Sequence, residues 1–103
     1  MLNEFSRAQL LLGKEAMEAL AGARVAVFGI GGVGSFAAEA LARAGVGNLD
    51  VFDDDKVCLT NINRQLIALH STIGKQKVEV MRDRILDINP RCVVTAHVCF
   101  YSA

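Results

Sequence analysis

Short apolar runs, rich in β-branched residues, recur along the chain and predict three strands. They cover residues 24–28, 48–53 and 92–98, and glycine, acidic residues or proline bound them. We expect the first of these strands to be buried, because its run is short, apolar and flanked by glycine.

Helical periodicity occupies the intervals between the strands. Residues 35–45 carry a face of alanine and leucine that ends at Gly45, and residues 77–88 end before Pro90. The second segment has an apolar stripe opposite its charged side chains, as expected for an amphipathic helix. The stripe consists of Val78, Met81, Ile85 and Ile88.

The order strand, helix, strand, helix, strand is typical of a parallel sheet with right-handed crossovers. We therefore expect an α/β fold with a Rossmann-like parallel sheet. Three strands make only half of a typical doubly wound sheet, so we expect the sheet to be truncated after the third strand.

The N-terminal residues predict helical structure ahead of the sheet. Residues 4–23 are rich in leucine and alanine and predict one or two short helices, with breaks at Gly13 and Gly22. We divide the chain into a helical segment, 1–22, and a β-α-β-α-β unit, 23–103.

The composition is that of one globular domain, with 52% apolar and 21% charged residues among 103. Eleven basic and eleven acidic residues cancel, so net charge gives no argument for nucleic-acid binding. Cys58, Cys92 and Cys99 form no CxxC pair and predict reduced thiols rather than a metal site. Without a secretion signal or a membrane-length apolar run, we expect a cytoplasmic protein with no membrane partner.

A glycine-rich turn, GxGGxG, follows the first predicted strand and opens the next helix. Its glycines are Gly29, Gly31, Gly32 and Gly34. Glycines permit a tight turn and a close approach of the backbone to a ligand, and a helix N-terminus offers unpaired N–H groups to an anion. This context predicts nucleotide binding, but it does not distinguish NAD from ATP.

Three consecutive acids follow the second predicted strand. Asp53 lies roughly 20 residues after the glycines, where the dinucleotide-binding pattern places an acid on a ribose hydroxyl. We interpret Asp53 and Asp55 as candidate nucleotide ligands and Asp54 as a solvated turn residue.

A second polar cluster spans TNINRQ (60–65) and GKQK (74–77). Asn61 and Arg64 are three residues apart, so we expect them to share one face of a helical turn and to point together at the ribose and phosphates. The Arg64 guanidinium has the planar fork that suits phosphate oxygens.

Lys75 and Lys77 are expected in the first turn of the following helix, where the helix dipole disfavours positive charge. We interpret Lys77 as functional, because a local rule broken without compensation often marks a site, and Lys75 as a solvated residue. Arg64 and Lys77 together predict a polyphosphate whose charge is neutralised as it reacts. They favour ATP as a reactant over NAD as a hydride carrier.

The motifs at 29–34, 52–57, 60–65 and 74–77 resemble, in order and spacing, those of the ThiF/MoeB/HesA adenylating family, which includes the ubiquitin-activating enzymes. Within that family, residues 28–90 are most similar to the branch of tRNA threonylcarbamoyladenosine dehydratases. The resemblance covers nearly the whole chain, but only the N-terminal part of such an enzyme.

The resemblance implies ATP with Mg²⁺ as ligands, and a substrate carboxylate that attacks the α-phosphate to give an acyl-adenylate and pyrophosphate. For this branch it implies ATP-dependent cyclisation, a net dehydration, of threonylcarbamoyladenosine in tRNA. Gly31 and its neighbours would contact the nucleotide, and Asp53 would hold the ribose. The phosphates would be held by Asn61, Arg64 and Lys77, of which Arg64 and Lys77 are catalytic, while Gln65 has a less definite role in the same site.

The family also implies a homodimer in which an N-terminal arginine reaches the partner's phosphates. EFSRAQLL (4–11) resembles that segment, which nominates Arg7 as a catalytic residue supplied in trans and residues 1–22 as a dimer contact. The magnesium-binding aspartate of the family follows a later strand, so we expect no metal ligand within this chain.

Three alternatives remain open. A sulfur-carrier adenylyltransferase of the ThiF/MoeB type uses the same core and adds a sulfur-transfer partner. An NAD(P)-binding oxidoreductase domain would keep the glycines and Asp53 but leave Asn61, Arg64 and Lys77 as surface residues. A non-catalytic scaffold would use an open third strand for edge pairing.

Overall fold

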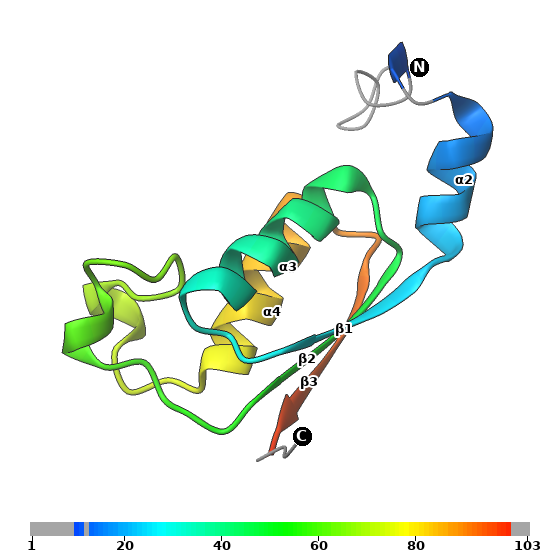
Figure 1. The fold of residues 1–103 in the computed structure, drawn as a ribbon. Coiled ribbons are helices and arrows are strands. Elements are labelled where there is room, and N and C mark those ends of the chain that lie inside the picture. The colour runs from blue at the N-terminus through cyan, green and yellow to red at the C-terminus, as the bar shows by residue number, and fades with distance from the viewer. Residues whose placement is uncertain (1–9, 12, 100–103) are drawn as a thin grey trace.

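The structure is a computed structural model, and it describes residues 10–11 and 13–99. Its elements follow the predicted order (Figure 1). They are α2 (Lys14–Gly22), β1 (Arg24–Phe28), α3 (Gly32–Ala44), β2 (Asn48–Asp53), the 3₁₀ turns η1 (Leu59–Asn61) and η2 (His70–Thr72), α4 (Lys77–Ile88) and β3 (Val93–Val98). The predicted strands and helices are confirmed, although α3 starts earlier than expected, inside the glycine turn.

The three strands form one parallel sheet in the order β1-β2-β3, with β2 at its centre. Helices α3 and α4 lie on the same face of this sheet, α3 against β1 and β2, and α4 against β2 and β3 (Figure 1). All three strands run in one direction, so their carboxyl ends meet at one edge. This arrangement confirms the α/β, Rossmann-like prediction.

The hydrophobic core lies between the two helices and the sheet. Val51 of β2 and Ala38 and Ala42 of α3 are completely buried. The small alanine side chains let α3 approach the strands closely. On α4 the predicted apolar stripe faces this core, with Ile88 as its less buried end. Each large apolar side chain buried here contributes about 1.5–3 kcal/mol to folding.

The opposite face of the sheet is left uncovered by the described residues, which corrects the prediction that β1 is buried. Arg24, Ala26 and Phe28 are exposed, and in this strand only Val27 is buried. Parallel strands are buried on both sides when helices cover both faces, whereas α3 and α4 occupy the same face.

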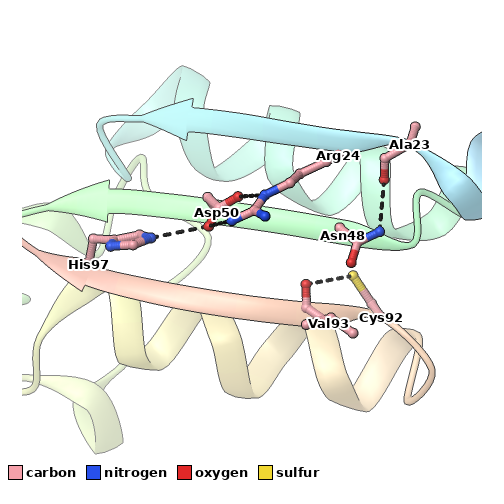
Figure 2. Close-up of polar contacts among 7 residues, drawn as sticks. All are labelled: Ala23, Arg24, Asn48, Asp50, Cys92, Val93 and His97. Atoms are coloured by element: carbon pink, nitrogen blue, oxygen red, sulfur yellow. Dashed lines mark hydrogen bonds and ion pairs between the residues drawn. The ribbon is translucent and has the colours of Figure 1, made fainter.

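Side chains on the uncovered face contact one another across the strands. The Phe52 ring stacks on Phe28 and on His97, at centroid distances of 4.5 and 4.2 Å. Asp50 accepts hydrogen bonds from Arg24 at 2.7 and 3.1 Å, and its Oδ1 lies 3.1 Å from His97 Nε2 (Figure 2). The hydrogen bond from Arg24, followed by that with His97, lowers the pKa of the Asp50 carboxyl to about 2.

Helix α2 precedes the sheet and contains no buried residue. It begins after Gly13, as predicted, and leads into the amino end of β1 (Figure 1). The Gly47 N–H donates to the Leu20 carbonyl at 3.1 Å and so ties the end of α2 to the sheet. None of the helices in the described part of the chain has the length and hydrophobicity needed to cross a bilayer.

Candidate functional site

The predicted site residues that the structure describes surround the carboxyl ends of β1 and β2. The glycine turn (29–34) connects β1 to α3, the acids (53–55) end β2, and residues 56–76 lead to the start of α4. Ligands of open α/β sheets bind at this edge, because the loops that follow the strands enclose it.

Two glycines fix the shape of the turn. Gly29 has a φ of 86°, which other residues rarely adopt, and its N–H donates to Phe52 O at 2.8 Å. A Cβ at Gly34 would lie 1.6 Å from Gly29 O, so only glycine fits there. Helix α3 begins at Gly32 with Gly31 as its N-cap and no capping side chain, which leaves its first N–H groups available to an anion.

Asp53 is buried and holds the glycine turn in place. Its Oδ2 accepts the Ile30 N–H at 2.6 Å, and its Oδ1 accepts the Asp55 N–H at 2.8 Å. Hydrogen bonds to an ionised acceptor are roughly twice as strong as neutral ones. The carboxylate therefore joins the turn to the acidic segment, and its remaining lone pairs are available to a ribose hydroxyl.

Lys77 brings a buried positive charge to the acidic segment. It is the first residue of α4, and its Nζ lies 3.9 Å from Asp55 Oδ2. The Lys77 side chain is 8% exposed, whereas that of Asp55 is 69% exposed. The Lys77 N–H also donates to Asp55 O at 3.0 Å. A long contact to a solvated carboxylate compensates a buried ammonium only in part, so the lysine favours the approach of a second anion.

Lys75 does not lie in the first turn of the helix, which corrects the prediction. Helix α4 begins two residues later, and Gln76 is its N-cap. Lys75 is exposed, and its carbonyl accepts the Val57 N–H at 2.9 Å beside the antiparallel bridge of Lys56 and Gln76. The Lys75 backbone thus takes part in the pairing of two loop segments, and α4 therefore begins only at Lys77.

Asn61 and Arg64 lie on one turn, but their side chains take different directions, contrary to the prediction. Asn61 is buried, and its Oδ1 accepts the Cys58 N–H at 2.9 Å, closing η1. Arg64 is exposed, and its Nη1 donates to Thr60 O at 2.8 Å and to Asn63 Oδ1 at 3.3 Å. Local side-chain-to-backbone bonds compete with the spacing rule for regular helices and decide both orientations here.

Gln65 packs against the glycine turn. It is 9% exposed, and its Oε1 is buried with no hydrogen-bond partner among the described residues. Its Nε2 lies 3.7 Å from where a Cβ on Gly31 would be. A buried polar atom without a partner costs about 1–3 kcal/mol. The sequence motif nominated Gln65, but only the packing shows that its Oε1 is unsatisfied among the described residues.

The carboxylates of Asp53, Asp54 and Asp55 lie within 4.8 Å of one another, close enough to ligate a cation. Asp53 already accepts two backbone N–H groups, and Asp55 faces the Lys77 ammonium. A cation here would compete with Lys77, so we derive no metal site from this cluster.

Arg7, the predicted residue supplied in trans, lies outside the described residues. The three cysteines form no disulfide, and burial raises the pKa of the Cys92 thiol.

Sequence reasoning missed the contact of Arg24 with Asp50, because no residue pattern within one strand reveals which side chains face each other across a sheet.

Comparisons with known proteins agree with this architecture. The sequence profile described as the ThiF family matches residues 5–102. The tRNA threonylcarbamoyladenosine dehydratase of Bacillus subtilis (strain 168) is 58% identical over 102 residues, which are 99% of this chain and 40% of that protein. The molybdopterin-synthase adenylyltransferase of Escherichia coli (strain K12) is 44% identical over 81 residues, 79% of this chain and 32% of that protein.

A solved structure has the same fold. The crystal structure of E. coli tRNA N6-threonylcarbamoyladenosine dehydratase in complex with ATP aligns with a TM-score of 0.94 and 48% identity, over 96% of this chain and 41% of that one. The chain thus spans less than half the length of these relatives. Because the profile covers nearly all of its residues and the parallel sheet carries the glycine turn, the chain belongs to the ThiF family.

Proposed function

We propose that this chain is the ATP-binding part of an adenylating enzyme that activates a carboxylate as an acyl-adenylate. The observation that carries the proposal is a continuous set of contacts from Ile30 to Asp53, from Asp53 to Asp55, and from Asp55 to Lys77. These contacts hold a glycine-rich helix N-terminus and a buried cation at one edge of the sheet, and both favour negative charge. The relative that was solved with ATP, 48% identical to this chain, supports ATP as the ligand.

Each site residue then has a task. The phosphate chain lies against the backbone of the glycine turn, which is formed by Gly29, Gly31, Gly32 and Gly34. Asp53 offers its remaining lone pairs to the ribose, and Asn61 fixes the following turn in shape. The Arg64 guanidinium, which hydrogen-bonds Thr60 and Asn63 at the surface, leaves them and turns towards the phosphates. Lys77 offsets the negative charge that develops on the phosphates in the transition state.

The proposed reaction is adenylyl transfer. A substrate carboxylate oxygen attacks the α-phosphorus of ATP, and the bond between that phosphorus and the bridging oxygen breaks to release pyrophosphate. In threonylcarbamoyladenosine of tRNA, the substrate named for the 58% identical relative, an internal nucleophile then closes a ring on the activated carbonyl and expels AMP. The substrate loses the elements of one water, whose oxygen leaves with AMP, as ATP is converted to AMP and pyrophosphate. Positioning and charge stabilisation are the main contributions of a protein to such a step.

The remaining parts of the proposal concern assembly and location. Residues 1–22 form the contact of a homodimer, in which Arg7 reaches the partner's phosphates, and residues 23–103 form the nucleotide-binding unit. Mg²⁺ accompanies the ATP and offsets its phosphate charge, with ligands outside the acids at 53–55. A tRNA substrate implies a cytoplasmic protein.

A second candidate is adenylation of a sulfur-carrier protein, with a sulfur-transfer partner. The 44% identity to a molybdopterin-synthase adenylyltransferase favours it. The two candidates differ in the carboxylate donor. Incubation with ATP and either threonylcarbamoyladenosine-containing tRNA or a sulfur-carrier protein distinguishes them, because pyrophosphate is released only with the true substrate.

Calorimetry tests the ATP proposal directly. We expect the protein to bind ATP with magnesium more tightly than NAD, and preferential binding of NAD would contradict the proposal. Arg64→Ala and Lys77→Ala are expected to weaken ATP binding. Should neither substitution change nucleotide affinity or adenylation, the oxidoreductase alternative would be favoured, because it treats both residues as surface.

A further inference from the structure

Helices α3 and α4 are joined by an ion pair that has no task in the proposed reaction so far. Arg84 of α4 donates from its Nε to Glu39 Oε1 of α3. The Glu39 side chain is 16% exposed and that of Arg84 36%, so water screens this pair less than an ordinary surface pair. In the part of the chain that the structure describes, no other hydrogen bond or ion pair connects the two helices. They otherwise meet through the apolar core, and apolar packing is not directional.

The ion pair lies equally far from the N-termini of the two helices. Glu39 comes seven residues after Gly32, the first residue of α3. Arg84 likewise comes seven residues after Lys77, the first residue of α4. Seven residues of α-helix are almost two complete turns, about 10 Å along the axis. Since the strands are parallel, both helices return in the same direction on one face of the sheet (Figure 1). The pair therefore holds the two helix N-termini at one level.

The same spacing places Lys77 and Arg84 on one face of α4. Two residues seven positions apart differ by only about 20° around the axis of a helix. The pairing of Arg84 with α3 therefore turns the Lys77 side of α4 towards α3 as well. The Lys77 N–H donates to Asp55 O at 3.0 Å, but a single backbone hydrogen bond does not fix the rotation of a helix about its axis. The Lys77 ammonium is held loosely, 3.9 Å from Asp55 Oδ2.

We propose that Glu39 and Arg84 are positioning residues for adenylyl transfer. Their ion pair sets the rotation of α4 about its axis, and with it the direction of the Lys77 ammonium relative to the N-terminus of α3. This inference rests on the proposed function, in which Lys77 offsets the charge that develops on the phosphates. A displacement of about 1 Å at a reacting centre costs about 10²-fold in rate even when its cause is distant. The pair thus acts on the rate through Lys77, without touching the nucleotide.

Two substitutions in the complete protein break the pair, Arg84→Gln from one side and Glu39→Gln from the other. The rate is measured as release of pyrophosphate from ATP with magnesium, with threonylcarbamoyladenosine-containing tRNA or a sulfur-carrier protein as the carboxylate. We expect each substitution to lower this rate by about tenfold or more. Arg43→Gln is the matched control, because Arg43 also pairs with Glu39, at 3.7 Å, but lies on the same helix. An equal loss of rate in the control would overturn the inference.

A double substitution separates positioning from a general loss of stability. Lys77→Met removes the ammonium that the pair is proposed to direct, so adding Arg84→Gln to it should lower the rate no further. If the two losses multiply instead, Arg84 does not act through Lys77 and the inference is overturned. Thermal unfolding of every variant accompanies the rates. If Arg84→Gln and Glu39→Gln are both unfolded at the assay temperature, the pair is structural and the inference is likewise overturned.

The remaining outcomes separate this inference from the proposed function. If the wild-type protein releases pyrophosphate and both Arg84→Gln and Glu39→Gln match its rate, this inference alone fails. If the wild-type protein releases no pyrophosphate with either carboxylate, the proposed function fails and the inference fails with it.

Discussion

The Asp53 carboxylate accepts the Ile30 N–H at 2.6 Å, so the end of β2 holds the glycine turn that follows β1. The second carboxylate oxygen accepts the N–H of Asp55, the residue whose side chain faces Lys77. This buried acid therefore joins the glycine turn to the acidic segment, and Asp55 joins that segment to the start of α4. The dinucleotide-binding pattern gives this position a ribose-binding task, and the structure adds the task of shaping the turn.

Asp53→Asn tests that second task. The amide keeps the size of the side chain but replaces one acceptor oxygen with a donor, which cannot pair with a backbone N–H. We expect the free energy of unfolding to fall by about 1–3 kcal/mol, the cost of a lost hydrogen bond to a buried charged group. Urea denaturation measures it. Asp54→Asn is the control, because this neighbour is exposed, and its change should stay within about 0.5 kcal/mol.

Gly34→Ala tests the close approach within the turn. The added methyl group would lie 1.6 Å from Gly29 O, a backbone atom that cannot move aside without distorting the turn. We expect a loss of about 3 kcal/mol in unfolding free energy, at the upper end for overpacking. Gly32→Ala is the matched variant, since its Cβ would meet only Arg64 O at 3.9 Å. Equal stabilities of the two variants would show that the turn relaxes freely.

Lys77→Met tests the buried cation. Methionine is one atom shorter but similar in volume, and it removes a charge whose partner is a solvated carboxylate. We therefore expect little loss of stability and a fall in the rate of acyl-adenylate formation of about 10²–10³-fold, typical for loss of one transition-state-stabilising group. Exchange of labelled pyrophosphate into ATP measures the rate. Lys75→Met, at an exposed position before the helix, should leave it unchanged.

The Asp50 carboxyl predicts a specific dependence of stability on pH. Its pKa in the folded protein is about 2, below the ordinary 3.8, because Arg24 and His97 hydrogen-bond to its charged form. Because its pKa is lowered on folding, the Asp50 carboxyl stabilises the folded protein at pH values above the pKa that this carboxyl has in the unfolded chain. The stabilisation is lost as pH falls from about 4 to about 2. We expect the wild type to be more stable than Asp50→Asn at neutral pH, with the gap narrowing across that window. Thermal unfolding at a series of pH values measures the gap, and a constant gap would contradict the assignment.

The succession of strands and helices could be predicted from the sequence because periodicity is a local property. Val78, Met81 and Ile85 had to lie on one stripe of any helix over 77–88, and all three are buried on α4. The alternation of strands with helices then favoured a parallel sheet, which the register of β1 with β2 confirms.

The detail of the candidate site was less predictable. Asn61 and Arg64 have the spacing of helical neighbours, yet one closes a 3₁₀ turn and the other bonds at the surface. A short polar side chain such as that of Asn61 chooses among several nearby backbone groups, and the long Arg64 side chain reaches a carbonyl four residues earlier. The start of α4 shifted for a similar reason, since the Lys75 backbone pairs with Val57.

The sequence by itself determined the order of the elements, the glycine turn and the family to which the motifs belong. These depend on residue identity and spacing along the chain. Tertiary structure alone decided that β1 has one open face, that Asp53 bonds the Ile30 backbone, and that Gln65 Oε1 is buried without a partner among the described residues. Burial and hydrogen-bond satisfaction depend on which distant segments pack together, and local periodicity carries no information about that.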